Sequence, residues 1–163
     1  MRVIKIFLFS TIFIVFLQTN VFGQSVKDST TIPISKHSIG IGAGFTTGVG
    51  LSYIFLPKRF GVQINLGPTT SKTSQFVSAG LTFLYRIKQG SNLNLLMYQG
   101  NHYFYKERSF YSYKQSHNFN IGLGIGLETF KDNIGFYFMS GFARYSNLLG
   151  VGLTVESGLY YKL

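Results

Sequence analysis

Strict alternation between large apolar residues and small or polar ones is the feature that most constrains the fold of this chain. Every odd-numbered residue from Phe119 to Leu127 is apolar, and the residues between them are Asn120 and three glycines. Side chains of a β-strand point alternately to its two faces, so this stretch predicts a strand with one bulky apolar face and one small or polar face. A helical period does not fit it.

The same alternation recurs along most of the chain. Eight segments show it and are predicted to be strands: 37–46, 48–56, 59–68, 75–88, 92–105, 117–130, 134–145 and 148–163. Most have the length of a tilted membrane-crossing strand, about 9–11 residues or slightly more. Three segments are less regular. Ile54 and Leu56 fall on the polar face, Gln99-Gly100 is expected to form a β-bulge, and Arg144 is expected at or beyond the membrane edge.

The connections between these segments predict how the strands are joined. The second, fourth and sixth connections (57–58, 89–92 and 131–133) are short and contain turn-forming residues. The opposite set contains two longer connections (68–74 and 106–116) and two tight ones (46–47 and 146–147). An even strand number with such connections predicts an all-β fold, an eight-stranded antiparallel up-and-down transmembrane β-barrel.

The composition of the two faces indicates which one points outward. Only 12% of the residues are charged, whereas a soluble domain typically carries about 25%. The small polar face suits the narrow lumen of an eight-stranded barrel, which has room only for side chains. Arg86, Glu128 and Glu156 on that face are predicted to pair with one another in a lumen polar network, because unpaired buried charges are costly.

Two other barrel types are alternatives to this interpretation. A soluble periplasmic lipocalin-like carrier would have its apolar face inside, and the irregular alternation in three segments leaves this possibility open. A diffusion pore is disfavoured, because eight strands enclose little space and the three lumen charges would obstruct it.

The N-terminal residues predict export. Residues 1–23 have the anatomy of a cleaved signal peptide, with basic Arg2 and Lys5, an apolar run over 6–17 and a cleavage site before Gln24. Residues 24–36 are polar and are predicted to be a flexible periplasmic N-terminal segment, followed by the barrel domain over 37–163. The sequence has no Cys, which excludes disulfides and lipid attachment through cysteine.

Together these features resemble the small outer-membrane β-barrel proteins of Gram-negative bacteria, especially those of the Bacteroidetes type. The resemblance rests on Phe22-Gly23 before the cleavage site, the alternating strands over 37–163, and the ending GLYYKL over 158–163. It implies an integral protein of the cell outer membrane that the barrel-assembly machinery inserts. That machinery reads a final strand with alternating apolar residues and usually an aromatic terminus, from which Leu163 departs. The resemblance implies an architecture and no activity.

The sequence contains little that predicts chemistry. Its three histidines (His37, His102 and His117) are isolated, and no metal-site spacing or nucleotide-binding motif is present, so we expect no cofactor and no metal. The net charge of +10 could indicate nucleic acid, but the compartment argues against that partner. Outer-membrane lipid and anionic lipopolysaccharide are the expected partners of a monomer, the latter contacting Lys72, Lys106, Arg108 and Lys114.

The connection over 106–116 is the candidate surface-binding loop, because it mixes aromatic and cationic residues. Its candidate residues are Lys106, Arg108, Phe110, Tyr111, Tyr113 and Lys114. A solvated loop with no ligand is the simpler interpretation. The expected function is therefore a non-enzymatic barrel with a structural or surface-binding role.

One enzymatic alternative comes from a second resemblance. Lipid A deacylases are eight-stranded barrels that use a His-x-Ser-Asn segment and a later Glu. The segment from Arg144 through Ser146 to Asn147, with Glu156 downstream, is similar. However, Arg144 occupies the position of the base and cannot accept the serine proton. A lipid A-modifying acyl hydrolase would need His102 or His117 from a neighbouring strand instead.

Overall fold

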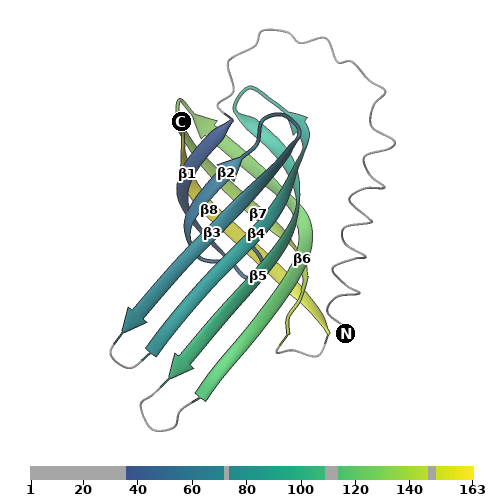
Figure 1. The fold of residues 1–163 in the computed structure, drawn as a ribbon. Helices are drawn as coiled ribbons and strands as arrows, with labels where there is room; N and C mark the ends of the chain where they lie inside the picture. The colour runs from purple at the N-terminus through teal and green to yellow at the C-terminus, as the bar shows by residue number, and fades with distance from the viewer. Residues whose placement is uncertain (1–35, 72–73, 109–113, 147–149) are drawn as a thin grey trace. The chain divides into compact units, whose positions relative to one another are not determined.

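The structure, a computed structural model, describes residues 36–163 except 72–73, 109–113 and 147–149. The predicted signal peptide and residues 24–35 of the predicted N-terminal segment lie outside the described residues. Eight strands form a single closed barrel (Figure 1). They are β1 (His37–Gly44), β2 (Gly50–Phe55), β3 (Phe60–Ser71), β4 (Ser74–Gln89), β5 (Leu93–Arg108), β6 (Lys114–Lys131), β7 (Ile134–Arg144) and β8 (Val151–Lys162). No helix in these described ranges is long and apolar enough to cross a membrane.

Each strand pairs antiparallel with the next one in the chain, and β8 pairs with β1 to close the barrel. The closing seam aligns Ile39 with Tyr161 and Ile41 with Leu159. Within the closed part of the barrel each strand is paired on both sides, which is the requirement for a sheet inside lipid. The predicted all-β, eight-stranded antiparallel up-and-down barrel is confirmed, and each predicted segment contains one strand or most of one.

Large apolar side chains cover the outer wall of the barrel. Leu51, Leu123 and Leu153 are 69%, 63% and 72% exposed, although apolar residues of this size are normally buried in a soluble domain. Soluble monomers rarely expose continuous apolar patches larger than a few hundred Å². The alternation therefore has the orientation predicted for a barrel in lipid. The lipocalin-like orientation, with the apolar face inside, is wrong.

The lumen holds a mixture of polar and apolar side chains. Its most deeply buried polar members include Gln63, Asn65, Thr82, Thr154 and Glu156. Ile54 and Leu56 also point inward, as their position in the alternation predicts, and each is 5% exposed. They pack in one cluster with Leu84, Tyr98, Tyr137, Met139 and Tyr160.

Two hairpins, β3–β4 and β5–β6, are longer than the alternation predicts. The segments 68–74 and 106–116, predicted to be connections, are mainly paired strand, and pairing continues to Ser71 with Ser74 and to Arg108 with Lys114. These four strands extend beyond the others at one end of the barrel (Figure 1). Where a strand leaves lipid, both faces tolerate polar residues, so an alternation of apolar residues no longer marks its continuation.

The predicted β-bulge at Gln99-Gly100 is wrong. Phe83 pairs with Gln99 and Thr82 with Gly100 in continuous register. The disturbed alternation has another cause, because Gln99 and Asn101 are two polar residues on the outer wall. The Gln99 amide nitrogen donates to the Asn101 side-chain oxygen at 2.9 Å, and Asn101 donates back at 3.2 Å. This reciprocal pairing partly satisfies both amides there.

The register shift lies in β4 instead. Arg86 pairs with Leu96 and Lys88 pairs with Leu95, so Ile87 is an extra residue in β4. Such a bulge changes which face the following side chains occupy. Arg86 remains in the lumen, whereas Lys88, which the alternation places on the polar inner face, is exposed beside outward-facing Leu95.

Candidate functional site

The connection between β1 and β2 folds into the barrel lumen. The sequence predicts a tight turn near Thr46-Thr47, but five residues (45–49) separate the two strands, and both threonines are 0% exposed. Gly48 and Gly50 have φ values of 89° and 136°, a region that favours glycine and lets the chain turn back to the wall. We call residues 45–49 the lumen loop.

Glu156 on β8, the strand next to β1, anchors the lumen loop. Its Oε1 accepts hydrogen bonds from the Thr46 amide at 3.1 Å and the Thr46 hydroxyl at 2.6 Å. Its Oε2 accepts from the Thr47 amide at 3.2 Å and the Thr47 hydroxyl at 2.7 Å. The Thr154 hydroxyl also donates to Oε1. Two successive amides directed at one carboxylate form an anion-binding backbone arrangement, which offsets the cost of burying Glu156.

Side chains of the barrel wall satisfy the carbonyl groups of the lumen loop. The Phe45 carbonyl accepts from the side-chain amide of Asn120 at 2.9 Å and lies 3.1 Å from Nδ1 of His102. The Thr47 carbonyl accepts from the side-chain amide of Asn65 at 2.9 Å. The loop is therefore bonded to β3, β5, β6 and β8, which satisfies its buried backbone groups.

Glycines on the inner face make room for this loop. A Cβ atom on Gly80 would overlap the carbonyl oxygen of Thr47, and one on Gly100 would lie 2.6 Å from the carbonyl oxygen of Thr46. Gly80 of β4 and Gly100 of β5 therefore allow the loop backbone to approach the wall closely. The alternation places Gly80 on the small polar face, whereas Gly100 was expected in a β-bulge, and neither residue predicts the loop that they accommodate.

A second polar cluster lies towards the other end of the lumen. Arg86 Nη2 is 3.9 Å from Glu128 Oε2, and both side chains are nearly inaccessible. Asn94 donates to Glu128 Oε2 at 2.6 Å, and the Tyr160 hydroxyl donates to Oε1. Arg86 also donates to the carbonyl of Lys58 at 3.1 Å.

The structure therefore separates the three charged residues that were predicted to pair with one another. Arg86 lies beside Glu128, but among the described residues no cationic side chain forms an ion pair with Glu156. The prediction is wrong for Glu156 because alternation places a residue on a face and says nothing about its height in the barrel. Glu128 pairs with Asn94 near one end, whereas Glu156 pairs with Gly44 at the end of β1.

The candidate surface-binding loop has a different form from the one predicted. Lys106 pairs with Phe76 and Ser116 inside the long β5–β6 hairpin, and Arg108 pairs with Lys114 at its end. Phe110, Tyr111, Tyr113 and Lys72 lie outside the described residues.

Histidine and tyrosine side chains lie together on the outer face of the same hairpin. The Tyr103 hydroxyl lies 2.8 Å from Nδ1 of His117, and the rings of Tyr105 and His117 are 4.9 Å apart. In the sequence His117 is isolated, and nothing there predicts its contact with these tyrosines. Their antiparallel register brings them together.

The acyl hydrolase-like segment does not assemble as a triad within the described residues. The Ser146 hydroxyl accepts a hydrogen bond from the Phe119 amide at 2.9 Å, whereas Glu156 is enclosed in the lumen by threonines. Arg144 lies exposed on the outer wall, and Asn147 lies outside the described residues. His102 and His117 bond elsewhere, to the lumen loop and to Tyr103. The described residues also contain no group of three or more histidine or acidic side chains positioned to hold a metal ion.

An apolar outer wall around a closed eight-stranded antiparallel sheet defines a β-barrel of the membrane-spanning class. Its similarity to solved structures is consistent with this class. The N-terminal β-barrel domain of OprF from Pseudomonas aeruginosa superposes with a TM-score of 0.55 at 13% identity, covering 77% of this chain and 93% of that domain. Neisserial surface protein A superposes with a TM-score of 0.51 at 10% identity, covering 78% and 94%. At these identities the similarity concerns the fold. No protein-family model and no curated protein matches the sequence.

Proposed function

We propose that this chain is a non-enzymatic integral protein of the bacterial outer membrane, exported through its N-terminal signal peptide, with a structural or surface-binding role. The observation that carries the proposal is the apolar outer wall, on which Leu51, Leu123 and Leu153 are more than 60% exposed. A chain with this surface needs lipid around it to avoid a large exposed apolar area. The similar folds of two outer-membrane barrels support the same location.

The filled lumen favours a closed barrel over a pore. The lumen loop is bonded to Asn65 on β3 and Asn120 on β6, and Tyr98 and Met139 are at most 1% exposed in the interior. An eight-stranded barrel has room only for such side chains. Surface contact, and not conduction, is therefore the function that this interior supports.

The long β3–β4 and β5–β6 hairpins are the proposed contact surface. A chain that enters the barrel from the periplasm has these hairpins on the cell exterior, because they lie at the end opposite the N-terminus of β1 (Figure 1). Lys106, Arg108 and Lys114 lie along the β5–β6 hairpin. Their charge suits the anionic groups of lipopolysaccharide, and neighbouring tyrosines suit its sugars.

The last strand supports the proposed route of insertion. Val151, Leu153, Val155, Leu159 and Tyr161 of β8 all face outward. This is the alternating apolar signal that the barrel-assembly machinery is expected to read, and it continues to the end of β8 despite the terminal Leu163.

Electrophoresis of unboiled and boiled outer-membrane fractions tests the proposal. We expect the unboiled protein to migrate differently, because a closed barrel resists SDS until it is heated. The same migration in both samples, with the protein recovered from the soluble periplasmic fraction, would exclude a membrane barrel.

Photo-crosslinking in intact cells tests the proposed contact surface. A crosslinking residue in place of Glu107, in the long β5–β6 hairpin, is expected to capture lipopolysaccharide. The same residue in place of Asn133, in a periplasmic turn, is the matched control and should not. Equal capture at both positions, or none at position 107, would exclude lipopolysaccharide as the partner of these hairpins.

A further inference from the structure

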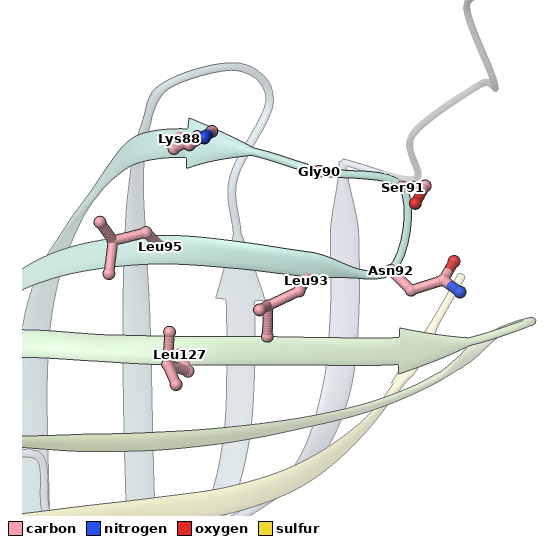
Figure 2. A pocket seen from close by; sticks show the side chains of 7 residues that line it. All are labelled: Lys88, Gly90, Ser91, Asn92, Leu93, Leu95 and Leu127. Atoms are coloured by element: carbon pink, nitrogen blue, oxygen red, sulfur yellow. The ribbon is translucent and has the colours of Figure 1, made fainter.

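A shallow groove of about 350 Å³ lies on the outer wall beside the turn that joins β4 to β5. Leu93 and Leu95 of β5 and Leu127 of β6 lie close together in it, and Lys88 lies at the end of β4 (Figure 2). Leu93 and Leu127 are 51% and 48% exposed. The groove therefore combines an uncovered apolar floor with one ammonium group.

The β-bulge at Ile87 is what brings Lys88 into this groove. In a continuous register Ile87 would oppose Leu95, and Lys88 would face the lumen near Glu128. The extra residue makes Lys88 the partner of Leu95, so both side chains occupy the outer wall. Leu95 pairs in turn with Leu127 on the next strand, so Lys88, Leu95 and Leu127 are neighbours across three adjacent strands. One inserted residue thus moves a cation from the interior to an apolar surface.

Charge around this rim of the barrel favours an anionic occupant. The described side chains here include one acidic residue, Asp132, and six cationic ones: Lys36, Lys58, Arg59, Lys88, Lys131 and Lys162. All but Lys162 are exposed. Each basic residue near an anionic lipid surface contributes about 1 kcal/mol of attraction. In the groove one of these cations, Lys88, lies beside three leucines.

We infer that the groove binds an anionic phospholipid, with the lipid phosphate beside Lys88 and an acyl chain across Leu95 and Leu127. This inference rests on the proposed outer-membrane barrel, which places the groove in the periplasmic leaflet. The aliphatic stem of a lysine packs along apolar surface while its ammonium group reaches the headgroup region. A free phosphate would use only Lys88 and leave the leucine floor uncovered, so a lipid fits the whole groove.

Native mass spectrometry of the folded protein in detergent tests this inference. We expect phosphatidylglycerol to bind more tightly than phosphatidylcholine with the same acyl chains. Lys88→Gln should weaken phosphatidylglycerol binding about fivefold, the equivalent of about 1 kcal/mol, whereas Lys88→Arg should retain it. Arg144→Gln removes an exposed cation from the opposite end of the outer wall and should leave binding unchanged. Leu127→Thr should weaken binding without any change in charge.

Three results would overturn the inference: equal binding of the two lipids, unchanged binding in Lys88→Gln, or displacement of the lipid by millimolar inorganic phosphate. The last result would identify a phosphate site without an acyl component. Heat-modifiable migration of each variant reports folding separately. A wild-type barrel that folds and shows no preference for phosphatidylglycerol overturns this inference alone, whereas a wild-type chain without a folded band overturns the proposed function.

Discussion

Glu156 on β8 accepts hydrogen bonds from both the backbone amide and the hydroxyl of Thr46, at 3.1 and 2.6 Å, beside the β1–β8 seam of the barrel. This contact connects a strand near the C-terminus to a loop 110 residues earlier in the chain. Because the neighbouring threonine bonds to the same carboxylate, one side chain holds the centre of the lumen loop. The two central residues of the loop therefore share one buried carboxylate as their acceptor.

Glu156→Ala is expected to destabilise the barrel by about 3 kcal/mol or more. The substitution leaves buried amides and hydroxyls of Thr46 and Thr47 without their acceptor, and hydrogen bonds to a charged group contribute about 1.5–3 kcal/mol each. Glu156→Gln should have a smaller effect, because its oxygen still accepts on one side. Urea titration in lipid vesicles, read as the folded band on unboiled gels, measures the free energy of unfolding.

Glu107→Ala is the matched control, because Glu107 accepts a hydrogen bond from Tyr105 on the outer side of the long hairpin. It should cost less than about 1 kcal/mol, as partly exposed polar pairs do. Planar-bilayer conductance should rise for Glu156→Ala and stay at the wild-type level for Glu107→Ala. Equal stability and equal conductance of the two variants would mean that Glu156 does not hold the loop in place.

Gly80→Ala is expected to displace the lumen loop. Its new methyl group would overlap the carbonyl oxygen of Thr47, and overpacking of this kind costs about 1–3 kcal/mol. Gly152→Ala is the matched control on β8, where the nearest atom is the Tyr145 ring at 3.1 Å, on a side chain that can move. The urea midpoint of Gly80→Ala should fall and that of Gly152→Ala should change little. The opposite order would contradict the proposed fit between loop and wall.

How far the sequence predicts this structure depends on what alternation encodes. It specifies the face of nearly every residue, and so the strands, their closure and the apolar outer wall could be predicted. It does not specify the position of a residue along the barrel axis. For that reason Glu128 and Glu156 were expected to meet, although they lie in separate clusters. It also fails at Lys88, where one extra residue shifts the register and reverses the face.

The lumen loop could not be predicted for a related reason. Thr46 and Thr47 have the composition of an ordinary surface turn, and their burial depends on Asn65, Asn120 and Glu156, which come from distant strands. Only the glycines of the facing wall carry a local signal. Glycine on an inner face is equally compatible with a narrow empty lumen, so that signal is ambiguous without the register.

Arg86 and Glu128 are expected to be energetically coupled to each other and not to Glu156. Removing one member of a buried charge pair typically costs about 3–5 kcal/mol, whereas replacing both by apolar residues costs far less than the sum. The Arg86→Met and Glu128→Leu double-mutant cycle should therefore show a coupling energy above about 1 kcal/mol. The cycle of Arg86→Met with Glu156→Ala should be additive, because the two residues share no hydrogen-bond partner. Strong coupling in the second cycle would restore the single network expected from the sequence.

An arginine scan of the outer wall should locate the edge of the lipid. Ile125 and Val77 are both outward-facing aliphatic residues, 60% and 42% exposed. Ile125 pairs with Met97 in the middle of β6, whereas Val77 pairs with Tyr105 in the extended hairpins.

Ile125→Arg should therefore destabilise the inserted barrel by about 2–4 kcal/mol, the cost of an arginine near the bilayer midplane, and Val77→Arg by about 0–1 kcal/mol. Folding yields and urea midpoints in vesicles measure both. A soluble barrel would tolerate the two substitutions equally, so similar midpoints for both variants would contradict a lipid-embedded wall. A large loss of stability for Val77→Arg as well would instead show that the membrane edge lies at the long hairpins. Tyr103 and His117 would then lie in the membrane–water interface.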